Sequence, residues 1–450
     1  MTFSSMNFLV LFFPLVFILY FPVKNRTYRN TVLLIASLLF YAWGEPVYIV
    51  LMLVSSLVAY VGAIIIDKTK YRKTALVITL FLLLLNLVIF KYTNFIFENI
   101  GLCSPNLPLP IGISFYTFQI ISYVADFYKG KVKLQKNFFY LTLYVSFFPQ
   151  LIAGPIVRYQ TVEDEILNRK ESISSVAAGL RRFTVGLAKK VVIANNVALI
   201  STAVFKGDSN FGSAIYWLAA IAYALQIYFD FSGYSDMAIG LGKIFGFNFL
   251  ENFNYPYISC SITEFWRRWH MSLSGWFRDY VYIPLGGNRC SKLRHILNIL
   301  TVWALTGLWH GASWNFVLWG VYYAALLLIE KYFLSGILKK CPKFITWVYT
   351  MFFVLISWVI FENTDLVNMK NALFTLFDFS KTNWSGAILD NTSMLWGALF
   401  VPIGILAMTP AFKKVRLKNW LLNILTVILF GICIIFIISS DFNPFIYFRF

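Results

Sequence analysis

The residues best suited to acid–base chemistry in this sequence are its three histidines, His270, His295 and His310. The ordinary pKa of histidine lies close to neutrality, so the ring can take up or release a proton under physiological conditions. A placed general acid or base typically contributes about 10²–10⁴-fold to a reaction rate. His295 follows Arg294 at the start of a predicted helix, and we expect it to be a solvated loop residue.

His310 lies where two apolar runs meet, Ile296–Trp309 and Trp314–Ile329. An ionisable residue between such runs is costly in lipid and by default marks a functional site. Burial would favour the neutral form of the ring, which can act as a base. Gly307 and Gly311 carry no side chain, so they are expected to let a substrate approach. The alternative is a structural histidine that is hydrogen-bonded between helices.

His270 lies in an aromatic and basic segment, together with Trp266, Arg267, Arg268 and Trp269. One interpretation is a helix at the membrane interface whose arginines extend toward the headgroups. The other is a wall that binds an anionic or thioester-bearing donor at the cytoplasmic face. Residue types alone favour the first interpretation.

A polar cluster ends one of the apolar stretches and contains Asp230, Ser232, Tyr234 and Asp236. These side chains could polarise a histidine or shape a substrate entrance. They could equally cap a helix that begins after Asp236. The spacing favours capping.

Several common catalytic and metal-binding patterns are missing from the sequence. It contains no GxSxG elbow, Walker loop or HExxH motif, so a serine hydrolase, an ATPase and a zinc protease lose their main support. The five cysteines show no CxxC spacing, which indicates neither a metal site nor a disulfide framework.

The composition is that of a membrane protein. Of the 450 residues, 59% are hydrophobic and 13% are charged, and the mean hydropathy is +0.70. Soluble domains carry about 25% charged residues, so lipid must cover much of this chain. The formal net charge of +18 resides in short loops between apolar stretches, as the positive-inside rule requires. We therefore expect no nucleic acid partner.

The apolar stretches predict an all-α polytopic protein with roughly 11–12 transmembrane helices, since a span needs about 20 residues. The first stretch lacks the features of a signal peptide and is expected to be retained. The simple candidate spans are Met6–Phe21, Thr31–Trp43, Val47–Ile66, Thr74–Phe90, Leu109–Phe127, Val191–Phe205, Ala214–Phe229, Phe344–Phe361, Leu395–Phe412 and Trp420–Ser439.

Loop charges predict the orientation. Lys24, Arg26 and Arg29 follow the first span, and a second basic loop between Lys68 and Lys73 follows the third span. This alternation predicts that the basic loops are cytoplasmic and that both termini are extracytoplasmic.

Two apolar segments break the alternation, because basic loops flank each of them on both sides. Phe138–Ala153 is interrupted by Pro149 and by Gly154 and Pro155 directly after it, and is expected to be a re-entrant or in-plane element, buried in protein or lining a cavity. The pair of runs around His310 has arms of 14–16 residues. Such arms are roughly 21–24 Å long, whereas the hydrocarbon core is about 30 Å thick. His310 is therefore expected to lie within the bilayer.

The chain resembles the membrane-bound O-acyltransferase (MBOAT) family, and within it the branch of alginate and related polysaccharide O-acetylation membrane proteins. The resemblance runs nearly end to end, and the number of short motifs in order makes it specific. The motifs are Met1–Ser5, Phe40–Trp43, Leu109–Gln119, Gln150–Ile156, Asp230–Asp236, Phe265–His270, Gly307–Gly311 and Phe445–Phe450.

The resemblance implies one MBOAT domain over residues 1–450, with a ring of helices, additional re-entrant helices and a cytoplasmic funnel. It implies that His310 and His270 are the catalytic pair and that no metal takes part. The substrate-binding residues predicted with them are Trp266, Arg267, Arg268, Trp269, Trp309, Asp230, Ser232, Asp236 and Asn315.

The resemblance further implies an O-acyltransferase of the bacterial inner membrane that acts in exopolysaccharide biosynthesis. No bound cofactor is expected, and the acyl donor would be acetyl-CoA or another acyl thioester, including one on an acyl carrier protein. Besides membrane lipid, the expected partner is an extracytoplasmic SGNH-type acetyltransferase or other polysaccharide-modification machinery. The alternatives are D-alanyl transfer to teichoic acid, a transporter or channel, and a scaffold without enzymatic activity.

Overall fold

The computed structural model describes residues 1–152, 154–207, 211–380, 391–411 and 417–439. These residues form helices and no strand, which confirms the all-α prediction for the described chain. Three parts of the sequence predictions, Ala153, Phe412 and the terminal run Phe445–Phe450, lie outside the described residues.

Seven helical stretches within the described residues are long and apolar enough to cross a membrane. They are Ile49–Lys68, Arg72–Asn99, Ile173–Phe205, Ser213–Ile244, Trp314–Leu338, Lys343–Glu362 and Asn419–Ser439, and the shorter Asn7–Tyr20 and Thr392–Ala407 are also apolar. In Asn419–Ser439 only 6% of the most apolar window is buried, so lipid must cover the rest. The protein is therefore a multi-pass membrane protein.

The sequence predicts more spans than these seven. The difference arises because some predicted spans form shorter helices, such as Arg26–Ala42 with 17 residues and Ile113–Tyr128 with 16 residues.

The chain divides into two compact units. Unit 1 comprises Met1–Leu187 and Tyr234–Glu251, and unit 2 comprises Ala188–Gly233 and Asn252–Phe450. Helix α12 (Ser213–Ile244) contributes residues to both units. The single domain over residues 1–450 stays a prediction.

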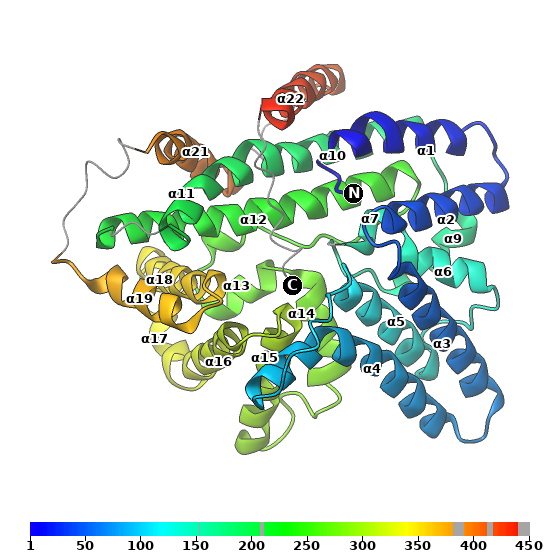
Figure 1. The fold of residues 1–450 in the computed structure, drawn as a ribbon, viewed down its shortest axis with the longest axis horizontal. Helices are drawn as coiled ribbons and strands as arrows, with labels where there is room; N and C mark the ends of the chain where they lie inside the picture. The colour runs from blue at the N-terminus through cyan, green and yellow to red at the C-terminus, as the bar shows by residue number, and fades with distance from the viewer. Residues whose placement is uncertain (153, 208–210, 381–390, 412–416, 440–450) are drawn as a thin grey trace. The chain divides into compact units, whose positions relative to one another are not determined.

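Unit 1 contains the N-terminal helices. Asn25 begins the second of them, because its side chain accepts a hydrogen bond from the backbone N–H of Tyr28 at 3.0 Å. Helices α3, α4 and α5 pack side by side (Figure 1). The elements are η1 (Asn7–Phe12), α1 (Phe13–Tyr20), α2 (Arg26–Ala42), α3 (Ile49–Lys68), α4 (Arg72–Asn99), α5 (Ile113–Tyr128), α6 (Phe138–Ser146), α7 (Phe148–Leu151), α8 (Tyr159–Val162), α9 (Glu165–Asn168) and α10 (Ile173–Ala188).

The segment predicted to be re-entrant is interrupted as expected. The backbone leaves the helical region at Phe147 (φ −53°, ψ 110°), which separates α6 from the four-residue α7. With nine residues, α6 is about 14 Å long and cannot cross a bilayer. Its depth in the membrane stays a prediction.

Unit 2 surrounds a core of tryptophan, tyrosine and phenylalanine side chains. Besides its share of α12, its elements are η2 (Lys189–Ala194), α11 (Asn195–Phe205), η3 (Pro256–Ile258), α13 (Ile262–Arg268), α14 (Met271–Phe277), η4 (Arg278–Tyr282), α15 (Lys292–His310), α16 (Trp314–Ile329), η5 (Glu330–Leu334), α17 (Ser335–Leu338), α18 (Lys343–Glu362), α19 (Leu366–Phe377), α21 (Thr392–Ala407) and α22 (Asn419–Ser439).

Candidate active site

The predicted hairpin around His310 is formed by α15 and α16, which pack against each other and are joined by the short turn Gly311–Ser313. Ser291 caps the start of α15 by accepting a hydrogen bond from the backbone N–H of Arg294 at 3.4 Å. The backbone becomes extended at Gly311 (φ −178°, ψ 156°), which ends α15 immediately after His310.

The glycines beside His310 serve the packing of this hairpin, and the expectation that they clear space for a substrate is wrong. A Cβ on Gly307 would collide with the carbonyl oxygen of Phe316, and a Cβ on Gly311 would collide with the Phe316 ring. On α16, a Cβ on Gly320 would collide with the carbonyl oxygen of Trp303. The space left by these glycines is therefore filled by the neighbouring helix.

His310 is enclosed by aromatic rings. Its ring centroid lies 5.0 Å from that of Trp309, 5.1 Å from that of Trp319 and 5.2 Å from that of Phe361. Only 4% of the residue is exposed. The predicted burial of His310 is confirmed, and it holds whatever the depth of the ring in the bilayer.

His270 belongs to the same aromatic cluster. It lies at the break between α13 and α14 in a left-handed conformation (φ 43°, ψ 55°) and is 1% exposed. Its ring centroid lies 5.9 Å from that of Trp309, the residue that also contacts His310. The structure thus brings the two predicted catalytic histidines together around one tryptophan.

Hydrogen bonds and burial set the electrostatics of His270. Its Nδ1 lies 3.1 Å from Oδ1 of Asn252, a residue that the sequence predictions missed. Burial, together with the neighbouring His310, holds the pKa of His270 well below its ordinary value. The ring is therefore neutral at physiological pH and able to accept a proton.

Trp266 and Trp269 form walls of the aromatic cluster. The Trp266 ring makes edge contacts with Trp303 and Trp319, at centroid distances of 4.7 and 5.5 Å. The Trp269 ring lies 4.9 Å from that of Trp358. Both tryptophans are buried, so they belong to the core of unit 2 and not to an exposed interfacial surface.

A buried carboxylate positions the helix that carries these tryptophans. Glu330 is 4% exposed and accepts hydrogen bonds from the backbone N–H groups of Ile262 and Thr263, each at 2.8 Å. These groups belong to the first turn of α13, where a negative charge is favourable. The sequence predictions missed Glu330, although a carboxylate within an apolar stretch was a signal of function.

Two cavities that share part of their lining lie beside the aromatic cluster. The larger one has a volume of about 750 Å³, and its lining includes the basic residues Arg267, Lys331 and Lys339 together with Glu264 and Glu330. The smaller one, about 320 Å³, shares Arg267 with it and is largely apolar. The lining of the smaller cavity also includes Trp266, Trp303 and Thr306, and Thr306 lies one helical turn before His310.

The two arginines of the predicted site differ in their environment. Arg268 forms an ion pair with Glu264 at 2.9 Å and donates to the carbonyl oxygen of Asn254. Arg267 is exposed and forms no ion pair with any residue that the structure describes. Of the two, Arg267 is therefore suited to bind an anion.

His295 lines the larger cavity, and the expectation of a solvated loop residue is wrong. It is 4% exposed, with Nε2 2.8 Å from Nζ of Lys331 and Nδ1 2.9 Å from the hydroxyl of Tyr332. A lysine ammonium can only donate, so Nε2 must be the acceptor. Burial and the charge of Lys331 lower the pKa of His295, in keeping with a neutral ring.

The polar cluster of Asp230, Ser232 and Asp236 does not cap a helix, so the capping interpretation that the sequence favoured is wrong. Helix α12 runs without interruption from Ser213 to Ile244, so Asp230, Ser232 and Asp236 lie within it. Asp230 forms a buried ion pair with Lys190 at 2.6 Å in unit 2. Asp236 lies in unit 1 and pairs with Arg182 at 2.6 Å. Ser232 lies between these two residues in the sequence and is also buried.

Asn315 connects the hairpin to α18. It is fully buried, and its amide nitrogen donates to the carbonyl oxygens of Ile360 and Phe361 at 3.3 and 3.0 Å. These bonds tie α16 to α18, and Phe361 in turn contacts His310. The contacts of Asn315 therefore suit a supporting role better than direct substrate contact.

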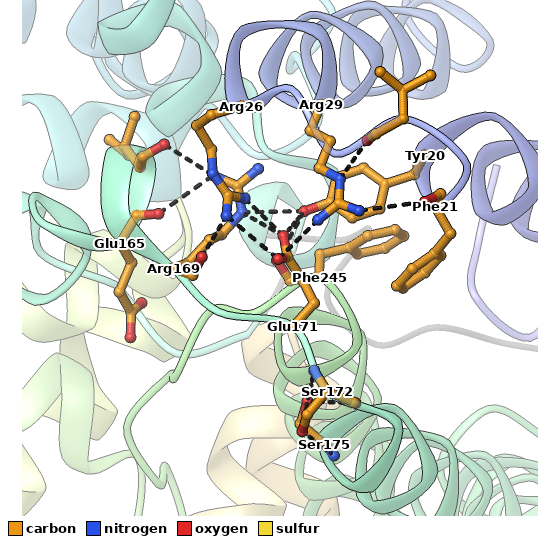
Figure 2. Close-up of polar contacts among 12 residues, drawn as sticks. Tyr20, Phe21, Arg26, Arg29, Glu165, Arg169, Glu171, Ser172, Ser175 and Phe245 are labelled. Carbon is orange, nitrogen blue, oxygen red and sulfur yellow. Dashed lines mark hydrogen bonds and ion pairs between the residues drawn. The ribbon is translucent and has the colours of Figure 1, made fainter.

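Unit 1 contains a separate polar cluster that the sequence predictions missed, which we call the Glu171 cluster. It consists of Glu171, Tyr20, Arg26, Arg29 and Arg169. Figure 2 shows the guanidinium groups of Arg26 and Arg29 converging on the Glu171 carboxylate, with N–O distances of 2.7 and 2.8 Å. The Tyr20 hydroxyl donates to the same carboxylate.

Arg169 completes the Glu171 cluster. Its side chain is fully buried, with Nε 3.6 Å from the Glu171 carboxylate and 3.2 Å from the hydroxyl of Tyr20. Burial favours the neutral form of Glu171, but the hydrogen bonds from Arg26 and Tyr20 and the nearby arginine charges outweigh it and lower the pKa of the carboxyl. The carboxylate is therefore ionised and fully used in holding the cluster together.

Comparison with known proteins finds a matching family and similar relatives. The model of the family "MBOAT, membrane-bound O-acyltransferase family" matches residues 69–369. The chain is 42% identical over 410 residues to a probable alginate O-acetylase of Azotobacter vinelandii, covering 87% of this chain and 81% of the relative.

Two further relatives carry related names. A peptidoglycan O-acetyltransferase of Helicobacter pylori is 32% identical over 512 residues, covering 100% of this chain and 97% of the relative. A teichoic acid D-alanyltransferase of Bacillus subtilis is 32% identical over 242 residues, covering 51% of this chain and 60% of the relative. With the family model matched over most of the chain, the protein belongs to the membrane-bound O-acyltransferase family, in its O-acetylation branch, and is an O-acyltransferase.

Proposed function

We propose that this protein transfers an acetyl group from a cytoplasmic thioester donor toward an extracytoplasmic polysaccharide or a partner acetyltransferase. The observation that carries the proposal is the pair of buried histidines, His270 and His310, that share contact with Trp309. The names of two relatives, a probable alginate O-acetylase and a peptidoglycan O-acetyltransferase, support an acetyl group and a polysaccharide acceptor.

His310 acts in this proposal as the general base. It takes the proton of the acceptor hydroxyl as the hydroxyl oxygen attacks the carbonyl carbon of the thioester. The new C–O ester bond forms, the C–S bond breaks, and the departing sulfur takes up a proton to leave as a free thiol. His270 positions or polarises a reacting group, and the aromatic walls keep water from the thioester.

The donor enters through the two cavities beside the site. Arg267, Lys331 and Lys339 line the larger cavity and suit the phosphates of a donor such as acetyl-CoA. The apolar cavity that continues toward Thr306 suits the thioester arm. Trp309 and the walls formed by Trp266 and Trp269 would enclose the acyl group, and Asp230 and Ser232 would face the acceptor. Arg268 and Asn315 support the site through their neighbours.

The location proposed for the protein is the bacterial inner membrane, with basic loops in the cytoplasm and both termini outside. The extracytoplasmic partner would be an SGNH-type acetyltransferase or other polysaccharide-modification machinery. A donor on an acyl carrier protein would use the same cavities. D-alanyl transfer is the second candidate, because a teichoic acid D-alanyltransferase matches about half of this chain.

The test uses inverted membrane vesicles that contain the full-length protein, with acetyl-CoA labelled in its acetyl group as the probe. Wild-type vesicles should release free thiol and incorporate the label into material inside the vesicles. His310→Ala should lower both by about 10²–10⁴-fold without changing the amount of inserted protein. Equal transfer by the wild type and a well-inserted His310→Ala variant would refute the role of His310. A D-alanyl-loaded carrier protein, tested in parallel, distinguishes the second candidate.

A further inference from the structure

The polar side chains of Asn252 and Ser272 lie against Nδ1 of His270, and that of Asn252 is the nearer. Asn252 is 1% exposed, and its Oδ1 lies 3.1 Å from Nδ1 of His270. The same oxygen accepts hydrogen bonds from the backbone N–H of Ser272 at 3.2 Å and from the Ser272 hydroxyl at 2.8 Å. The backbone carbonyl of Asn252 accepts from the N–H of Met271 at 2.9 Å. Asn252 therefore anchors both the imidazole and the first turn of α14.

These contacts determine which amide atom faces the histidine. A backbone N–H can only donate, so the Asn252 atom that meets the N–H of Ser272 must be the oxygen and not the nitrogen. An amide oxygen can only accept, so Nδ1 of His270 must carry the proton. The Ser272 hydroxyl agrees with this assignment, because it donates to Asn252 and turns its oxygen toward Nδ1 at 3.4 Å.

The opposite nitrogen of the ring is consequently the one with a lone pair. Nε2 of His270 is buried and has no hydrogen-bond partner among the residues that the structure describes. The ring centroids of Phe231 and Trp309 lie 4.6 and 5.9 Å from that of His270, so the surroundings of the ring are largely apolar. A buried acceptor without a partner is unfavourable in a resting structure, which indicates a group reserved for a ligand.

We propose that Asn252 is a positioning residue that holds His270 with its proton on Nδ1, so that the Nε2 lone pair accepts a hydrogen bond from a hydroxyl of the acceptor other than the one whose proton His310 takes. The inference rests on the proposed acyl transfer and assigns a specific role to His270 within it. In the other tautomer, Nε2–H would donate to the thioester carbonyl instead. Asn252 thus decides which of the two reactants His270 orients.

The identity of residue 252 is also compatible with the neutral ring that burial and the neighbouring His310 favour. An amide oxygen accepts the Nδ1 proton without adding a charge, whereas a carboxylate at this place would favour the imidazolium form. An imidazolium has no lone pair on Nε2 and could not accept a hydrogen bond from a hydroxyl. Asparagine fixes the tautomer and leaves the ring basic.

A direct test measures the tautomer in the unmodified protein. The chain contains three histidines, so histidine-selective ¹⁵N labelling of the full-length protein in lipid nanodiscs yields three ring systems. A His270→Gln variant identifies the signals of His270. Neutral His270 with its proton on Nδ1 supports the proposal, and a proton on Nε2 overturns it. This readout does not depend on catalytic activity, so it is independent of whether the proposed function is correct.

A second test uses substitutions and the release of free thiol from acetyl-CoA. Asn252→Ala should lower kcat about 10²-fold, with a mixture of tautomers in the ¹⁵N spectrum. Asn252→Asp should move the acidic limb of the pH–rate profile to higher pH, because the carboxylate raises the pKa of His270. A merely structural role would lower activity at every pH without moving this limb, and that result would overturn the proposal.

The matched control is Asn254→Ala. Asn254 lies two residues away and is exposed, and its hydrogen bonds with Arg268 involve its backbone rather than its side chain. The control should keep the wild-type rate, pH profile and His270 tautomer. If wild type and His310→Ala release thiol equally while His270 carries its proton on Nδ1, the proposed function fails and the tautomer assignment stands.

Discussion

The Glu171 cluster of unit 1 and the pair His270 and His310 around Trp309 in unit 2, which we call the histidine cluster, are both buried sites, but they satisfy their polar groups differently. Glu171 accepts from Tyr20 and Arg26 and forms ion pairs with Arg29 and Arg169. In His270 only Nδ1 has polar contacts, whereas Nε2 has no hydrogen-bond partner in the described chain.

The difference distinguishes a structural site from a site prepared for chemistry. The carboxylate of Glu171 is saturated by its neighbours, so the cluster gains stability and has little capacity left for a ligand. In the histidine cluster the buried acceptor Nε2 of His270 has no partner in the described chain, which costs stability but leaves the atom available to a reactant. Substitutions in the two clusters should therefore affect different quantities.

The largest effect is expected from His270→Gln, which should act on catalysis and not on folding. It removes the Nε2 lone pair of His270 from the site and should lower acyl transfer from acetyl-CoA by about 10²–10⁴-fold. The melting temperature in detergent, measured by intrinsic fluorescence, should stay near that of the wild type. A large drop in melting temperature with normal turnover would show that His270 stabilises the fold and does not act in catalysis.

Glu171→Gln should show the opposite behaviour. Removing one partner of a buried ion pair typically costs roughly 3–5 kcal/mol, because the remaining charges are left uncompensated. The variant should unfold at a lower temperature, while the turnover of the folded fraction stays near that of the wild type. Glu98→Gln is the matched control, because Glu98 is exposed. Equal melting temperatures for Glu171→Gln and wild type would show that the cluster does not stabilise the fold.

The pH dependence of the Glu171 contribution has a definite sign. The pKa of Glu171 in the folded protein lies below the ordinary value of 4.5, so the unfolded chain binds the proton more tightly. The stabilisation is fully present above that ordinary value and is lost as the pH falls through the lower folded pKa. Melting curves recorded through this acidic window should fall more steeply for the wild type than for Glu171→Gln.

Gly307→Ala should produce an intermediate loss of stability in the hairpin that carries His310. The added Cβ would collide with the carbonyl oxygen of Phe316, and forcing extra volume into a packed interface typically costs about 1–3 kcal/mol. Acyl transfer should fall as well, because α15 and α16 must move apart at the turn that places His310. Gly336→Ala is the control, since nothing lies within 4 Å of the added atom.

The smallest effect is expected from His295→Phe at the edge of the larger cavity. The substitution removes the acceptor of Lys331, which is exposed, so the loss should be about 1 kcal/mol or less. Because Lys331 lines the cavity proposed for the donor, the KM for acetyl-CoA should change more than kcat. A change in kcat alone would place His295 with the catalytic group and not with the entrance.

Local sequence patterns predicted much of the fold. The length and composition of the apolar stretches predicted an all-α membrane protein, and the break at Phe147 lies two residues before Pro149, which has no N–H to continue the helix. The hairpin of α15 and α16 was predicted from its arm lengths and flanking charges. Those patterns depend on residues close together in the sequence, and such patterns can be read without a structure.

Predictions that depended on distant partners were less successful. His295 was expected to be solvated because Arg294 precedes it, but Lys331 and Tyr332 from another helix enclose it. Gly307 and Gly311 were expected to make room for a substrate, but Phe316 fills that room. The polar cluster at Asp230 was expected to cap a helix, but α12 continues through it. Asp230 forms an ion pair with Lys190 instead.

The sequence by itself determined that this chain enters a membrane, forms helices and carries the histidines of its family, because composition, periodicity and motifs are properties of the chain. The tertiary structure decided that His270 and His310 meet around Trp309, and that Asn252 directs the proton of His270 to Nδ1. The physical reason is that a tautomer depends on the donors and acceptors that folding places beside each nitrogen. Asn252 and His270 are 18 positions apart, and only their contact in the folded chain reveals the role.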